Sequence, residues 1–153
     1  NNGDTLRGSW IKANDNFTEL YGNLPIGTVP TAWAATLTDS GGGRTFNVTV
    51  NVACHTSIGF VSTFTADLTV NSVSGSATGN LRLSLPDPVL YEAAFAVWLT
   101  NGTNQAKTAV IARAINGTSY CELSAFENGS ASSLAGHLQA TSRIIVTGTY
   151  FTS

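Results

Sequence analysis

The fold is decided by the stretch RTFNVTVNV, residues 44–52, in which apolar and polar side chains alternate. Phe46 and three valines occupy every second position, and threonine or asparagine stands between them. Because successive side chains of a strand point to opposite faces, this period of two predicts a half-buried β-strand with one apolar face. The same alternation continues along most of the chain that follows.

Seven further stretches are predicted to be strands, namely residues 60–70, 81–85, 93–99, 107–115, 119–126, 137–140 and 143–151. Asn101-Gly102 and Asn116-Gly117 are strong hairpin signals, and Asn128-Gly129 begins a polar loop. No helical pattern interrupts these strands. The spacing therefore predicts an all-β fold, an antiparallel β-sandwich or jelly roll with about eight or nine strands.

Residues 1–22 differ from the rest, because they carry an apolar stripe with the spacing of a helix. Its members are Leu6, Trp10, Ala13, Phe17 and Leu20, separated by four, three, four and three residues. Asp4 stands at the position of an N-cap, and Gly22 stands where a helix would end. Since an isolated helix this short is marginal in water, the stripe must dock on its own domain or pair with other copies of the chain. We expect the second arrangement.

These patterns divide the chain into three parts. Residues 1–22 form a helical stem for oligomerisation, residues 23–44 form a connector with strand character, and residues 45–153 form a β-sandwich head. Proline and a glycine run mark the limits of the connector, at Pro25 and at Gly41 to Gly43.

Two stretches resemble a known family. The first motif reads Gly3-Asp4-x-Leu6-Arg7, then Lys12-x-Asn14-x-Asn16-Phe17-x-Glu19-Leu20-Tyr21. It is similar to the stem motif of bacteriophage tail fibre and tailspike proteins. Residues 61–86, in which a strand, a Ser/Gly-rich turn and a strand ending in Leu85-Pro86 follow one another, resemble the distal heads of such fibres. The resemblance implies a homotrimer at the tip of a fibre or spike in the virion, made in the cytoplasm of the bacterial host.

Composition limits the classes of function. Hydrophobic residues make up 42% of the chain, charged residues only 10%, and the net charge is −2. The few basic residues are dispersed, which disfavours nucleic-acid binding, and no apolar run is long enough to insert into a membrane. A surface rich in hydroxyl and amide groups fits recognition of neutral polar ligands such as sugars. The start at Asn1 and the lack of methionine predict a fragment of a longer fibre or a processed product.

Residues for catalysis are scarce. His55 and His137 are the only histidines, and no serine lies in a Gly-x-Ser-x-Gly elbow. The neighbours Cys54 and His55 would point to opposite faces of a strand, so they form no catalytic dyad. Cys54 and Cys121 are expected to be free, inward-facing thiols. No spacing of a metal site appears. We therefore expect no catalytic residue, metal or cofactor, and hence no enzymatic activity.

Carbohydrate binding needs an aromatic ring and a few polar groups beside it. Tyr91 and Glu92 follow a proline-rich turn, and Trp98 alternates with apolar residues of its strand. Tyr120, Glu122 and Phe126 share one strand parity and lead into Asn128. We predict that these seven residues contact a ligand. The alternative for each aromatic residue is a place in the core or in a subunit interface.

The predicted function is adsorption, in which the trimer binds a host-cell surface polysaccharide or lipopolysaccharide without making or breaking a bond. Two alternatives stay open. The domain could be a purely structural clamp that trimerises the fibre, or it could be a polysaccharide depolymerase or esterase.

Overall fold

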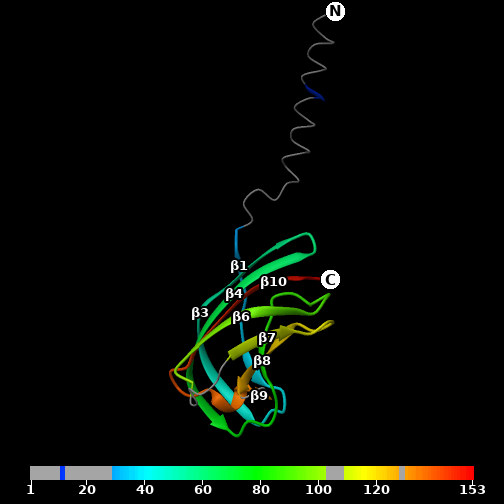
Figure 1. The fold of residues 1–153 in the computed structure, drawn as a ribbon. Helices are drawn as coiled ribbons and strands as arrows, with labels where there is room; N and C mark the ends of the chain where they lie inside the picture. Colours follow the sequence, from blue (N-terminus) through cyan, green and yellow to red (C-terminus); the bar gives the residue numbers. More distant parts are fainter. Residues whose placement is uncertain (1–10, 13–28, 103–108, 128–129) are drawn as a thin grey trace, which may run out of the picture.

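The computed structural model describes residues 11–12, 29–102, 109–127 and 130–153. They form one curled sheet, shown in Figure 1, and a single turn of 3-10 helix, η1 (Leu134–His137). The strands are β1 (Thr31–Ala32), β2 (Leu37–Asp39), β3 (Arg44–Ile58), β4 (Val61–Gly75), β5 (Leu81–Ser84), β6 (Ala93–Thr100), β7 (Ala109–Ala114), β8 (Tyr120–Glu127), β9 (Ser130–Ser133) and β10 (Arg143–Phe151). The predicted all-β class is confirmed.

Neighbouring strands in the described residues all pair antiparallel. Their order is β1-β3-β4-β10-β6-β7-β8-β5-β2, and β9 pairs with β8. β10 comes last in the chain but lies between β4 and β6, and β5 lies between β8 and β2. The order thus brings the last strand into the middle of the sheet.

The sheet has two ends that position its loops. The upper end in Figure 1 holds β1, the turn between β3 and β4 and the end of β10. The lower end holds the turn between β2 and β3, the segment between β4 and β5, and η1. The chain enters the sheet at the upper end, because Thr31 of β1 pairs with His55, three residues before the end of β3.

The side chain of Asp39 closes the curl at the lower end. One carboxylate oxygen accepts from the backbone N–H of Gly41 at 3.1 Å. The other accepts from the N–H groups of Arg44 at 3.1 Å and of Thr78 at 2.9 Å. The Arg44 guanidinium donates to the carbonyl of Ala135, which lies in η1, and to the carbonyl of Leu138, the residue after η1. These bonds join β2, β3, the segment before β5 and η1.

The inner face of the curled sheet is a continuous apolar core. Phe64 packs edge-to-face on Phe95, with 4.9 Å between ring centroids, and on Tyr150 at 5.8 Å. Gly148 makes room for this cluster, because a Cβ there would lie 2.3 Å from the ring of Phe95. Leucines of β5 and β8 fill the other half of the core, namely Leu81, Leu83 and Leu123. The interior is therefore packed with side chains.

The deciding stretch 44–52 is a strand, but its faces are less regular than predicted. The register with β4 shifts between Asn47 and Val48 and again between Val50 and Val52. Phe46 is buried, whereas Val52 pairs with Asp67 and is 45% exposed. Each shift adds an irregularity that changes which face the next side chain occupies. The expectation of one apolar face over the whole stretch was wrong at its second half.

Other local expectations met different outcomes. The Asn116-Gly117 turn joins β7 to β8, with Gly117 at a positive φ of 74°, so this hairpin is confirmed. The strand predicted at residues 137–140 is wrong, since His137 ends η1 and Gln139 begins a turn closed by Ser142. The polar segment after Asn128 contains β9, a strand that its serine-rich sequence did not predict.

The two cysteines are free in the described residues, as predicted, but only one faces inward. Cys121 is fully buried on the inner face. Cys54 pairs with Thr65, whose hydroxyl bonds across the outer face to Thr147, so Cys54 lies on the outer face and is half-buried. The expectation that both thiols face inward was wrong for Cys54, because the shifts in β3 reset the parity of the strand.

The predicted N-terminal helix lies almost entirely outside the described residues. Of residues 1–22 only 11 and 12 are described; they have helical backbone, and no helix is defined there. All five residues of the apolar stripe fall outside. The connector of residues 23–44 contains β1 and β2, which confirms its predicted strand character.

Asp39→Asn is expected to loosen the lower end. Four backbone N–H groups, those of Thr78, Gly41, Arg44 and Gly79, hold the pKa of Asp39 below its ordinary value against the opposing effect of burial. The stabilisation is present above pH 3.8 and is lost as the pH falls through the lowered folded-state pKa. The variant should therefore melt several degrees lower at neutral pH and lose less stability on acidification. Thermal unfolding by circular dichroism between pH 2 and 7 measures both.

Asp87→Asn is the matched control for this measurement. The Asp87 carboxylate lies at the upper end, where it accepts a hydrogen bond from Ser57, and it takes no part in the hydrogen bonds around Asp39. Equal melting temperatures for Asp39→Asn and the unmodified chain at neutral pH would contradict the proposed closure.

The two thiols are expected to react at different rates. Burial raises the pKa of the Cys121 thiol to about 12, so it stays protonated and enclosed at pH 8. A thiol reagent such as Ellman's should label Cys54 in the folded chain and Cys121 only after unfolding. A Cys54→Ser variant that still labels rapidly would contradict the assignment.

The buried thiol of Cys121 also predicts how stability depends on pH. Because this thiol ionises near 9.0 in the unfolded chain and near 12 in the folded chain, the free energy of unfolding should fall as the pH rises through this range.

Candidate functional site

The residues predicted to contact a ligand lie in three separate places. Tyr91 and Glu92 lie at the upper end, just before β6, and Trp98 lies on the outer face of β6. The remaining described ones, Tyr120, Glu122 and Phe126, lie on β8. Asn128 lies outside the described residues. The structure thus brings together the three residues of β8. Of the other two places, the upper end is linked to them through Arg113, which pairs in register with Glu122 and forms an ion pair with Glu92.

The alternation of inward and outward side chains predicted for residues 119–126 agrees with the burial observed along β8. Cys121, Leu123 and Ala125 are fully buried, so they point into the core. Tyr120, Glu122 and Phe126 alternate with them and are only partly buried, which places them on the outer face. This outer face is formed by the neighbouring strands β5, β8 and β7, and its β8 side chains are half-buried.

A charged row crosses these three strands. Arg82 of β5 pairs in register with Glu122 of β8, and Glu122 pairs on its other side with Arg113 of β7. Nε and Nη2 of Arg82 donate to Oε1 of Glu122 at 3.1 and 3.0 Å. Asn80 donates to the other oxygen, Oε2, at 3.0 Å. The carboxylate is therefore fixed by three hydrogen bonds.

Tyr120 completes this surface, which we call the β8 face: Asn80, Arg82, Arg113, Tyr120 and Glu122. The guanidinium carbon of Arg82 lies 4.1 Å from the centroid of the Tyr120 ring, a cation–π contact. Arg82 is thus held by a ring on one side and by a carboxylate at its edge. Arg113 carries a largely exposed guanidinium that reaches Glu92 at 3.2 Å.

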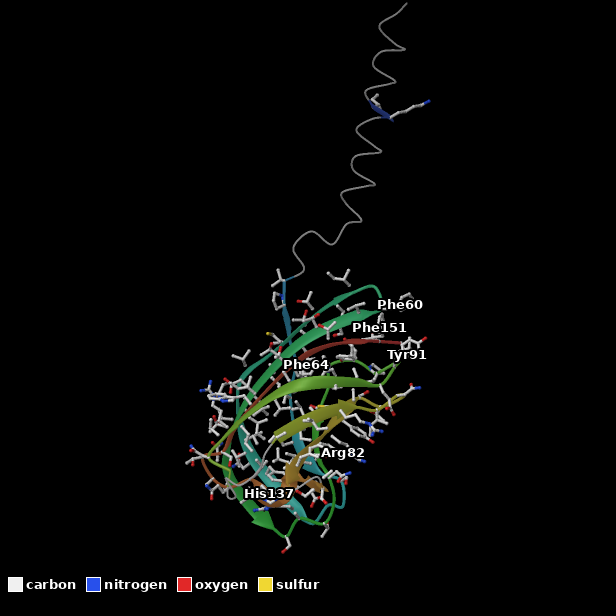
Figure 2. The ribbon with its side chains drawn as sticks, in the orientation of Figure 1. Phe60, Phe64, Arg82, Tyr91, His137 and Phe151 are labelled. Carbon is white, nitrogen blue, oxygen red and sulfur yellow. The ribbon has the colours of Figure 1, made fainter. Side chains whose placement is uncertain are left out.

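The β8 face offers chemistry suited to a polyhydroxylated ligand. Guanidinium and amide N–H groups donate hydrogen bonds, the carboxylate of Glu122 accepts them, and the Tyr120 ring supplies an apolar edge. These groups are held by one another before any ligand arrives, which reduces the entropy lost on binding. Figure 2 shows Arg82 on the lower half of the domain, well away from Phe60 and Tyr91.

Sequence reasoning missed Asn80, Arg82 and Arg113. Arg82 alternates with the buried Leu81 and Leu83, so an outward position could have been predicted from its strand. What the sequence does not contain is the order of the strands. β5 and β8 are separated by 35 residues, from Ser84 to Tyr120, and only the fold makes them neighbours.

Trp98 has a different environment. It is 55% exposed and pairs across the strands with Ile145 of β10. Threonine pairs follow on the same outer face, with Thr65 and Thr147 hydroxyls 3.2 Å apart. Asp67 lies in the same row as Trp98, on the other side of Ile145, and the hydrogen bond from Arg143 is the largest cause of the lowered pKa of Asp67. As predicted, Trp98 points away from Phe95, which is buried.

The histidine at the upper end does not form a catalytic triad. Nε2 of His55 lies 4.0 Å from Asp87, too far for a hydrogen bond, and Ser57 bonds the same carboxylate at 2.9 Å. A general base must bond the serine that it activates, whereas here the carboxylate lies between the two. Nδ1 of His55 is buried without a hydrogen-bond partner among the described residues, and its ring packs edge-to-face on Trp33.

Metal ligands and membrane spans were also sought in the described part of the chain. There, no three histidine, cysteine, aspartate or glutamate side chains gather in a way that could hold a metal ion. No helix in the same residues has the length and apolarity needed to cross a bilayer.

Comparisons of the chain with protein-family models, with curated proteins and with solved structures give no match. The resemblance of the first residues to the stems of phage fibres therefore remains a prediction from the sequence.

Glu122→Gln tests how much the β8 face contributes to the fold. Both partners of the ion pair keep contact with solvent, so the loss of charge should lower the free energy of unfolding by only about 1 kcal/mol. Urea unfolding followed by circular dichroism measures this change. A loss of the cooperative transition would show that the row is part of the folding core and not a surface available to a ligand.

Proposed function

We propose that this chain is the tip domain of a bacteriophage tail fibre or tailspike, which binds a carbohydrate on the host-cell surface. The stem motif of residues 3–21 supports the assignment to a fibre. The single observation that carries the binding function is the β8 face, where Tyr120, Arg82 and Glu122 are held in place on the outer face of the sheet and keep part of their surface in contact with solvent.

In this proposal the head is a sandwich of the jelly-roll type, and residues 1–22 form a helix that joins three copies. Each head binds a polysaccharide or lipopolysaccharide weakly, and three heads on one fibre raise the effective affinity. The chain adsorbs to the cell without cutting the polymer. It acts in the virion, after synthesis in the cytoplasm of the bacterial host.

The β8 face fits a sugar for a specific reason. The hydroxyl groups of a sugar need donors and acceptors at fixed places, and the hydrogen bonds among Asn80, Arg82 and Glu122 fix both kinds. Arg113 lies beside them with an exposed guanidinium, which would also pair with the carboxylate of an acidic sugar.

A second function is favoured by the outer face of β4, β10 and β6. This surface consists largely of small uncharged side chains, such as Thr63, Thr65, Thr147 and Thr149, with Trp98 standing out from it. A broad face whose charges are confined to the paired Asp67 and Arg143 suits contact between subunits, and in that case the domain is a clamp that closes a trimer. The two functions place their partners on different faces of the same head.

Binding of the full chain to host cells tests the proposal. Tyr120→Ala with Arg113→Ala should weaken binding about tenfold or more, because the apolar edge of a ring and charged hydrogen bonds are lost. Fluorescently labelled protein on whole cells and on a glycan array gives the measurement. Thr149→Ala, on the opposite outer face, is the matched control and should bind as the unmodified chain does.

Two further variants locate the surface that binds. Trp98→Ala reports on β6, and Tyr91→Ala reports on the upper end. A folded, unmodified chain that binds no cell would refute the receptor-binding function. Equal binding by the β8-face variant and the control would refute the assignment to that face.

A further inference from the structure

Three aromatic rings are exposed together at the upper end of the domain. Phe60 is 72% exposed, Tyr91 61% and Phe151 51%, and Figure 2 shows them near one another. We call this surface the aromatic patch. Ile58, in the same turn as Phe60, is 52% exposed and adds to it.

The backbone holds the three segments of the patch in place. The N–H of Leu90 donates to the carbonyl of Phe151 at 2.7 Å, and the N–H of Thr152 donates to the carbonyl of Phe60 at 2.8 Å. The rings of Tyr91 and Phe151 pack edge-to-face at 5.9 Å. The patch is therefore a preformed surface and not a set of separate loop tips.

Contact of these apolar rings with water is unfavourable in free energy, and burial against a partner would remove this contact. Each ring buries a large apolar area when it is covered, and clustered exposed aromatic residues mark interaction sites. The aromatic patch itself contains no charged side chain. Glu92, which follows Tyr91, is paired with Arg113, and Asp87 accepts a hydrogen bond from Ser57. The chemistry of the patch fits an apolar protein surface better than a sugar, which needs polar partners around the ring.

The position of the patch identifies the occupant. Val29 and Pro30 are exposed and lead into β1 at this same upper end, so the 28 residues before them join the domain at the end that carries the patch. Those residues carry the apolar stripe at Leu6, Trp10, Ala13, Phe17 and Leu20. If the stripes of several copies pair, they bring the upper ends of the heads to one axis, where their patches meet.

We propose that the aromatic patch is the contact between heads of sister copies, next to the stem. This inference rests on the self-association in the proposed function and is independent of glycan binding. It assigns Tyr91 to a subunit interface and leaves the β8 face, lower on the domain, for the ligand. Because each copy contributes the same surface, the contact repeats around the axis of the assembly.

The test compares assembly of full chains that differ only in exposed residues. Phe60→Ser with Phe151→Ser should raise the concentration needed for assembly about tenfold or more, since two interface aromatic residues are lost. Ile111→Ser is the control, because Ile111 is an exposed apolar residue of β7 that lies outside the aromatic patch and outside the face of β4, β10 and β6, and it should assemble as the unmodified chain does. Light scattering over a range of concentrations gives the mass, and circular dichroism checks the fold.

The outcomes separate this inference from the proposed function. Unchanged assembly of the double variant, or of Phe60→Ser alone should the double variant not fold, would overturn the inference. An unmodified chain that stays monomeric at every concentration would overturn it as well. Cell binding measured on the same samples is a separate readout: binding without patch-dependent assembly leaves the receptor function standing, and assembly without binding leaves the patch standing.

Discussion

The carboxylate of Asp39 is the constraint on which the rest of the structure depends. Its two oxygens accept from Gly41, Arg44 and Thr78, which belong to the turn before β3 and the segment before β5. A sheet with this many strands curls because its strands twist, but twist alone does not bring β2, at one edge, against β3, near the other edge. Asp39 holds β2 against the start of β3, and Arg44 then ties η1 to the same corner.

Closure of the curl divides the surface into an inside and an outside with different roles. The inside is filled by apolar side chains around Phe64 and the leucines of β5 and β8, so a ligand must bind on an outer face or at an end. The outer faces differ in chemistry. One carries the charged row of Arg82, Glu122 and Arg113, and the other carries threonine pairs and Trp98. Recognition and assembly can therefore use separate surfaces.

Much of the candidate site could be predicted one strand at a time. The alternation in β8 placed Tyr120, Glu122 and Phe126 on one face, and the structure has them there. The partners of Glu122 were not predicted, because Arg82 and Arg113 come from strands whose order no local pattern contains. Trp98 was likewise placed outward from its neighbours, yet its contact with Ile145 required knowing that β10 lies beside β6.

The sequence by itself determined the all-β class, most strand positions and the face of each regular strand, because these follow from the period-two pattern and from turn residues such as Asn116-Gly117. Only the tertiary structure decided the strand order, the register shifts in β3, the outward position of Cys54 and the helical turn at residues 134–137. The physical reason is the distance along the chain between the residues that set each feature. Alternation and turns are set by adjacent residues, whereas pairing between distant strands is set by how the whole core packs.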